Sequence, residues 1–159
     1  MTAHFDAARA KMSNKNMTQT DRMTPKAHFA EKLRLAGLRP TRQRVAIAAL
    51  LLDGRHRHVT ADSLTEEITT AGLHVSGGTV YNTLNQFTEA GLLRRVMIHN
   101  DYSLFDTKTD HHHHFYEVEN DQLVDIPHDD VILARLPAAP EGHEIKAVDV
   151  VIHIQSKNS

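Results

Sequence analysis

The chain has 159 residues, of which 40% are apolar, 5% aromatic and 24% charged, and it contains no cysteine. This size suits one ordinary domain or two small ones. The lack of cysteine excludes disulfides, thiolate zinc sites and cysteine nucleophiles. The net charge of −2 hides an asymmetry, because residues 1–98 hold 14 Lys and Arg against 8 Asp and Glu, whereas residues 99–159 hold 4 against 12. A basic front half suited to phosphate and an acidic back half suited to cations suggest two functions.

The first 25 residues are interpreted as a flexible tail. They carry scattered basic residues but lack the apolar segment of a signal peptide. Elsewhere no apolar run approaches the roughly 20 residues that a membrane-spanning helix needs. We therefore expect a cytoplasmic protein with no membrane partner.

Two short helices are expected after the tail. Residues 26–37 place apolar side chains at helical spacing and end at Gly37, which suits the C-terminus of a helix. Thr41 can cap the helix that follows. Arg42 and Arg44 fall in the first turn of that second helix, where the helix dipole disfavours cations. Contact with phosphate is one explanation for their position.

Two further helices and a hairpin follow. Thr60 and Ser76 are expected to cap helices that each end at a glycine. The apolar period then changes from helical to extended, so "LLRRVMI" and "YSLFDT" are predicted to be strands joined by a turn at residues 99–101. A helix–turn–helix followed by a hairpin predicts a winged-helix domain, which we place at residues 26–106.

The fourth helix has a polar face suited to reading DNA. Its hydrogen-bonding side chains replace the Glu and Lys mixture that is typical of a merely solvated face. Asn and Gln can pair with adenine, Thr or Tyr can contact a thymine methyl group, and arginines can hold the backbone, with Arg39 near a minor groove. The alternative is an ordinary amphipathic helix, which the wing and the positive charge disfavour. The predicted DNA contacts are Arg39, Thr41, Arg42, Arg44, Ser76, Thr79, Tyr81, Asn82 and Asn85.

The back half is expected to form a small α/β domain after a hinge at residues 107–110. The segments "HFYEVEN" and "QLVDI" are predicted strands around an Asn120–Asp121 turn, residues 131–136 a short helix, and "IKAVDVVIHI" a strand with one apolar face. Such a small domain, residues 111–155, buries little apolar surface alone, so we expect a homodimer. The predicted class of the whole chain is α+β.

Four consecutive histidines, His111 to His114, stand at the start of this domain. In an extended chain His112 and His114 share one face of the strand, and His111 and His113 share the other. A His-x-His pair can chelate a metal ion, and Asp125 on the neighbouring strand could join it. These ligands suit Zn²⁺, Fe²⁺ or Mn²⁺, whereas imidazole alone also suits haem iron. A polar, partly solvated strand is the alternative.

An enzymatic zinc site is disfavoured because the sequence has no H-E-x-x-H motif. We therefore predict that the chain is not an enzyme. A zinc-binding structural or enzymatic domain with no role in DNA binding stays open as a separate class.

The segments "LRPTRQR", "HVTADSL", "TVYNTLNQF" and "AGLL", with the His-rich strand, resemble the ferric uptake regulator family in order and spacing over residues 28–154. The resemblance implies a dimeric winged-helix transcription factor with a C-terminal α/β dimerisation domain. It also implies a regulatory metal site between the domains, with ligands at His58, Asp106, His112, His114 and Asp125. Both acids are Asp where the family more commonly has Glu.

Other family sites match the sequence poorly. The two C-x-x-C pairs of the family are absent. A second site in the dimerisation domain keeps candidates in His111 and His113, but its distal ligands fall near the apolar residues Ile132 and Val148. The resemblance therefore leaves this second site doubtful as an ordinary metal site.

The lack of cysteine together with "DHHHHFYE" and "LVDIP" is similar to one branch of the family, the iron response regulators. That resemblance implies haem as the leading cofactor, bound by His111, His112, His113 and His114 and brought by a haem-delivering protein. It implies a regulator that binds palindromic operator DNA as a dimer under iron limitation and releases it on haem binding. The alternative is a repressor of the ferric uptake type, with Fe²⁺ or Mn²⁺ as co-repressor.

Overall fold

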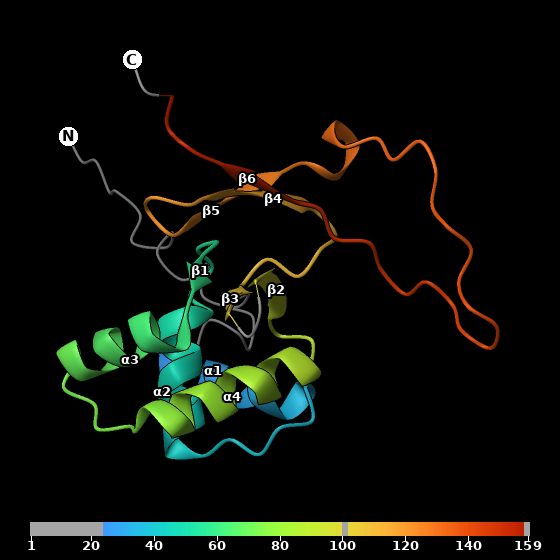
Figure 1. Cartoon of the computed structure of the whole chain (residues 1–159). Helices are drawn as coiled ribbons and strands as arrows, with labels where there is room; N and C mark the ends of the chain where they lie inside the picture. Colours follow the sequence, from blue (N-terminus) through green and yellow to red (C-terminus); the bar gives the residue numbers. More distant parts are fainter. Residues whose placement is uncertain (1–23, 100–101, 158–159) are drawn as a thin grey trace, which may run out of the picture.

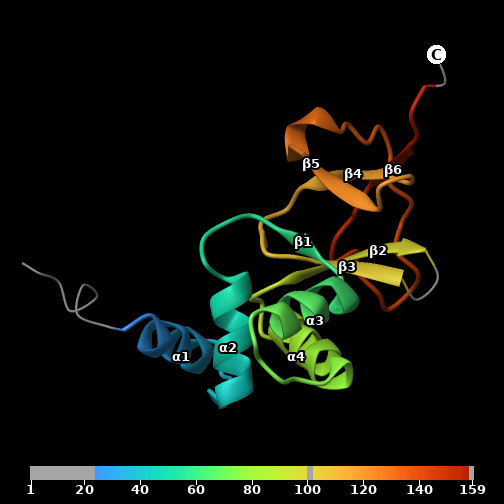
Figure 2. The same ribbon diagram turned by 90° about the vertical axis from the view of Figure 1, so that its left-hand side faces the viewer.

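The computed structural model of the chain describes residues 24–99 and 102–157. The helices gather at one end of the molecule, and two small sheets lie beyond them (Figures 1 and 2). The tail expected at residues 1–25 lies almost entirely outside the described residues, and so does most of the turn expected at residues 99–101. None of the helices in the described ranges is long and apolar enough to cross a membrane.

The four expected helices are all present. They are α1 (Pro25–Leu35), α2 (Arg42–Leu51), α3 (Ala61–Thr70) and α4 (Gly77–Glu89). The predicted caps are confirmed, since the side chains of Thr41, Thr60 and Ser76 each accept a hydrogen bond from a backbone N–H in the first turn. Local hydrogen bonding of this kind fixes where each helix begins, and thereby which of its faces turns inward.

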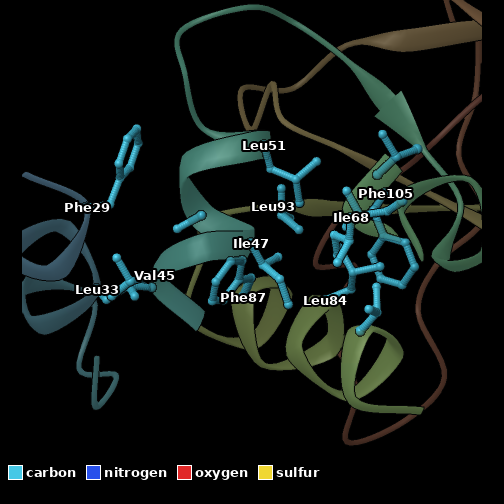
Figure 3. Close-up of a cluster of buried hydrophobic side chains, with 14 residues drawn as sticks. Phe29, Leu33, Val45, Ile47, Leu51, Ile68, Leu84, Phe87, Leu93 and Phe105 are labelled. Carbon is cyan, nitrogen blue, oxygen red and sulfur yellow. The ribbon is translucent and has the colours of Figure 1, made fainter. Parts of the chain in front are cut away.

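The main core lies between these helices (Figure 3). Side chains from α1 to α4 meet there, with Leu93 and Phe105 added from beyond α4. Leu33, Ile47, Leu84 and Phe87 are fully buried. This core holds α4 firmly, so the outer side chains of that helix have fixed positions.

Three antiparallel strands form the wing, in the order β1-β3-β2. They are β1 (His58–Val59), β2 (Arg94–His99) and β3 (Tyr102–Asp106). The two hairpin strands were predicted, but β1 was not, because two residues carry no detectable period. The pairing of β1 with β3 sets His58 opposite Asp106. Two candidate ligands that are distant in sequence are thereby brought together.

The second sheet has the order β5-β4-β6. Its strands are β4 (His113–Glu117), β5 (Gln122–Ile126) and β6 (Val151–Ile154), and β6 runs parallel to β4. The predicted turn between β4 and β5 is confirmed, with Asp121 in the left-handed region at φ 53°. The last strand is shorter than predicted, because only its final four residues pair with β4.

The helix predicted at residues 131–136 is wrong. These residues are irregular, and the only helical turn after β5 in the described part of the chain is the 3-10 helix η2 (His128–Asp130). A segment of six residues is far too short to hold a helix without packing of one face, and Ile132 is 89% exposed. The expected α/β character of the C-terminal domain is therefore corrected to a sheet with long irregular connections.

The wing also packs on the second sheet. Val96 and Leu104 of the wing form a buried cluster with Tyr116 and Leu123 of β4 and β5. We call this contact the wing–sheet interface. Residues 107–110, the predicted hinge, contain no helix or strand and connect β3 to the segment before β4. The division into domains at this hinge stays a prediction.

Candidate metal centre and nucleic-acid interface

The structure assembles a five-residue cluster between the wing and the second sheet, which we call the interdomain centre. Its members are His58, Asp106, His112, His114 and Asp125, and one ligand atom from each lies within 4.8 Å of all the others. The first two belong to β1 and β3, and the remaining three belong to the segment from His112 to β5. The residues that the family resemblance implied are therefore brought together from both sides of the connecting segment at residues 107–110.

Three imidazole nitrogens converge on two carboxylates. Asp106 Oδ2 lies 3.0 Å from His112 Nε2, 3.3 Å from His114 Nε2 and 3.5 Å from His58 Nε2. Asp125 Oδ1 lies 3.0 Å from His58 Nε2 and 3.4 Å from His112 Nε2. The side chains of Asp106, His112 and His114 are each 1% exposed, whereas those of His58 and Asp125 are 16% and 29% exposed, so the centre is buried on one side and reaches solvent beside Asp125.

The hydrogen bonding of the interdomain centre is incomplete, which fits a cation site. His58 Nε2, His112 Nε2 and Asp125 Oδ1 are buried, and although they lie 3.0 to 3.8 Å from one another or from neighbouring ligand atoms, none of them makes a hydrogen bond among the described residues. Buried polar atoms normally have a partner, so three orphans converging at one point call for a ligand. The Nδ1–H of His112 can donate to the carbonyl oxygen of Asp110 at 2.8 Å, which leaves the Nε2 lone pair facing the centre.

The carboxyl group of Asp106 stays ionised in these surroundings. Burial alone would raise its pKa, but the hydrogen bond with the His114 ring, the nearby His58 ring and the hydrogen bond from the backbone N–H of Lys108 hold the pKa well below its usual range. The group therefore presents a charged oxygen without first losing a proton. Imidazoles and carboxylates in this number suit Zn²⁺, Fe²⁺ or Mn²⁺.

A second cluster lies on the opposite face of β4. It joins His111 and His113 to His128 of η2, with ring centroids 4.7 to 5.4 Å apart. His128 was not among the predicted site residues. These three histidines line one side of an open cavity of about 480 Å³, whose other walls are mainly apolar and include Ile132, Leu133 and Leu136.

The alternation predicted for the histidine run is confirmed, and it separates the four histidines. His112 and His114 belong to the interdomain centre, whereas His111 and His113 belong to the cluster with His128. Haem binding by His111, His112, His113 and His114 stays a prediction, but the fold does not bring the four rings together at one place. In this fold the pairs point to different faces of the strand, and His112 and His114 are buried against carboxylates.

Helix α4 presents its predicted polar residues in different ways. Tyr81, which is 43% exposed, and Asn82 lie on the outer face, while Thr79 and Asn85 are half-buried. The Ser76 hydroxyl caps the helix and hydrogen-bonds the Thr79 hydroxyl at 2.9 Å. Among the predicted DNA contacts on this helix, Tyr81 and Asn82 are therefore the side chains that are freest to reach a base edge.

The residues predicted to contact the DNA backbone also differ in how exposed they are. Arg39 and Arg42 are exposed, and the exposed Thr41 uses its hydroxyl to cap α2. Arg44 is half-buried and hydrogen-bonds Gln86 Oε1 through Nε and Nη2 at 3.1 and 2.7 Å, and the Arg39 carbonyl through Nη1 at 2.9 Å. Arg44 therefore joins α2 to α4, a role that the sequence did not reveal.

A winged helix whose helix α4 has an exposed polar side, joined to a second sheet through a buried His/Asp centre, is the arrangement expected of a metal-responsive DNA-binding regulator. The sequence model of the ferric uptake regulator family matches residues 35–155. The chain therefore belongs to the ferric uptake regulator family.

Individual relatives agree with this membership. The ferric uptake regulation protein of Shigella flexneri is 30% identical over 123 residues, which cover 77% of this chain and 82% of that protein. That of Pseudomonas putida is 30% identical over 128 residues, or 79% of this chain and 96% of its own. The solved ferric uptake regulator of Pseudomonas aeruginosa with manganese is 26% identical, with a TM-score of 0.61 over 80% of this chain and 97% of that one.

Membership defines the kind of protein. Regulators of this family control transcription, bind operator DNA as dimers and bind divalent metals. The chain is accordingly a metal-responsive transcription regulator of α+β fold, and the prediction that it is not an enzyme is confirmed. The relatives named above are ferric uptake regulators, so they give no support to the iron response regulator branch in particular.

Proposed function

We propose that this chain is a dimeric repressor whose co-repressor is a divalent cation, Fe²⁺ or Mn²⁺, held at the interdomain centre. The observation that carries the proposal is the convergence of three buried, unpartnered ligand atoms on one point. The divalent cation replaces haem as the leading cofactor, because two of the four histidines in the run, His112 and His114, belong to this centre.

The arrangement of the ligands suggests how binding would affect DNA. His58 and Asp106 belong to the wing, whereas His112, His114 and Asp125 belong to the other side of the hinge. A cation bound there supplies positive charge that compensates the two carboxylates. Residues from both domains would then be held together, which fixes the pose of each winged helix in a dimer. Two half-sites of an operator demand such a fixed spacing.

DNA binding is expected to require the cation. Mn²⁺ should strengthen binding to an operator selected from random duplexes by about 5- to 150-fold, the usual range of coupling between two sites. Fluorescence anisotropy with Mn²⁺, with chelator, and with Mg²⁺ as a control for general charge screening measures this effect. Tighter binding in chelator than in Mn²⁺ would overturn the co-repressor proposal.

Haem is a second candidate ligand at a different place. The specific observation is the cluster of His111, His113 and His128 beside a largely apolar cavity. Imidazole can ligate haem iron, and apolar walls suit the porphyrin faces. Under this proposal haem, supplied by a haem-delivering protein, would signal iron sufficiency and release the operator DNA that the chain holds under iron limitation.

Spectroscopy separates the two histidine pairs. Titration with haem is expected to give a Soret shift that disappears when His111 and His113 are both replaced by alanine. The matched double replacement of His112 and His114 should leave the shift in place, because those rings face the interdomain centre. Loss of the shift only in the second variant would refute haem binding at this cavity.

A further inference from the structure

The wing–sheet interface connects the two domains at a place separate from the interdomain centre. Val96 and Leu104 of the wing are 4% and 3% exposed, and Tyr116 and Leu123 of the second sheet are 6% and 8% exposed. None of these four side chains is a candidate ligand. Their burial therefore favours the same closed pose that assembles the interdomain centre, and does so without any cation.

A polar contact closes the edge of this interface. Asp121, in the turn between β4 and β5, accepts a hydrogen bond from the hydroxyl of Tyr102 on β3 of the wing. Its other oxygen accepts a hydrogen bond from the hydroxyl of Tyr116 on β4 at 2.9 Å. One carboxylate thus holds two phenols, one from each side of the hinge. Of these two bonds, the one from Tyr102 crosses between the domains, and the one from Tyr116 lies within the second sheet.

The surroundings of Asp121 suit this role. Its backbone stands in the left-handed region of the turn, and its two carboxylate oxygens each meet one of the phenols. Burial, followed by the hydrogen bond to Asp121, raises the pKa of Tyr102. The phenol therefore keeps its proton and stays a donor, and a hydrogen bond to a charged acceptor is among the stronger kinds.

We propose that the Tyr102–Asp121 contact is an interdomain latch, which with the wing–sheet interface biases the chain towards the pose that assembles the interdomain centre. Tyr102 is then a positioning residue, since it belongs neither to the interdomain centre nor to the predicted DNA contacts. A bias of this kind raises cation affinity because it raises the fraction of molecules in the binding-competent pose. The effect on cation binding rests on the proposed function, whereas the effect on domain opening does not.

The chain offers a matched pair of substitutions for the test. Tyr102→Phe removes the hydroxyl that bonds across the domains, and Tyr116→Phe removes one that bonds the same carboxylate within the second sheet. Opening is read as the rate of trypsin cleavage after Lys108, in the hinge, followed by mass spectrometry of the full chain in chelator. Tyr102→Phe should raise this rate about tenfold, in line with the loss of a bond to a charged group, and Tyr116→Phe should change it less than about twofold.

The same variants then report on the cation. Mn²⁺ should slow cleavage of the unaltered chain, and half-maximal protection of Tyr102→Phe should need several times more Mn²⁺. The latch is overturned if Tyr102→Phe is cleaved in chelator at the rate of the unaltered chain. It is also overturned if Tyr116→Phe raises the cleavage rate as much as Tyr102→Phe does. If Tyr102→Phe opens faster but Mn²⁺ protects neither protein, the latch holds and the co-repressor proposal fails.

Discussion

Replacing His112 by alanine is expected to abolish Mn²⁺ binding, whereas the same replacement at the adjacent His111 should leave it intact. His112 Nε2 lies 3.0 Å from Asp106 Oδ2 and 3.4 Å from Asp125 Oδ1, within the interdomain centre. Loss of an outer hydrogen-bond partner of a metal ligand already costs about 10- to 100-fold in affinity, so loss of a ligand should cost at least about 100-fold. Isothermal titration calorimetry in metal-free buffer measures both variants.

The pair is informative because the two residues are neighbours of the same type. Both substitutions remove an imidazole from the segment just before β4, so a general loss of positive charge would affect them equally. Only His112 faces the two carboxylates, since successive side chains of a strand point to opposite faces. Thermal unfolding in chelator serves as the control for folding. Equal Mn²⁺ affinity in both variants would show that the ion binds elsewhere.

Operator binding should differ between the His112→Ala and His111→Ala variants in the same way as Mn²⁺ binding. The His112→Ala chain is expected to bind the selected operator in Mn²⁺ no better than in chelator, because its two domains are no longer joined through a cation. His111→Ala should keep the full response. A His112→Ala chain that retained the response would separate DNA binding from the interdomain centre.

The parts of this fold that sequence could predict are those determined by neighbours along the chain. The caps at Thr41, Thr60 and Ser76 depend on one side chain and a backbone group three residues later. The division of the histidine run depends only on the alternation of a strand. Both predictions hold because distant residues contribute little to them.

The parts that sequence alone did not predict depend on contacts across the chain. His58 entered the metal site only through the family resemblance, because its place opposite Asp106 is created by a two-residue strand. His128 reaches the other face of β4 through a 3-10 turn, which has no apolar period. The bridge from Arg44 to Gln86 joins residues 42 positions apart.

The helix predicted at residues 131–136 is an element that the sequence suggested but the structure does not form. Its composition is compatible with a helix, but Ile132, Leu133 and Leu136 are 89%, 45% and 46% exposed, so no apolar face is covered. Short helices gain most of their stability from packing, and local composition does not reveal whether a packing surface exists. The same exposed side chains are available to a second copy of the chain, as expected for a dimeric family.

Asn82→Ala is expected to lower affinity for the selected operator by about 5- to 150-fold, which corresponds to the roughly 1–3 kcal/mol of a good side-chain contact to a base. Asn82 is exposed on α4, whose opposite face is anchored in the core by Val80, Leu84 and Phe87. The truncation removes the amide that can pair with adenine and leaves the helix in place. Affinity for unrelated duplex DNA should not change.

Arg42→Ala is the control that distinguishes a contact to the DNA backbone from a contact to a base. Arg42 is exposed at the start of α2 and carries charge rather than a base-reading amide. Its loss should weaken binding to the operator and to unrelated DNA alike, and lower the slope of log affinity against log salt by about one. Asn82→Ala should keep the salt slope and lose only the preference for the operator. If both variants lost affinity for all DNA equally, α4 would contact the backbone, and sequence would be read elsewhere on the winged helix.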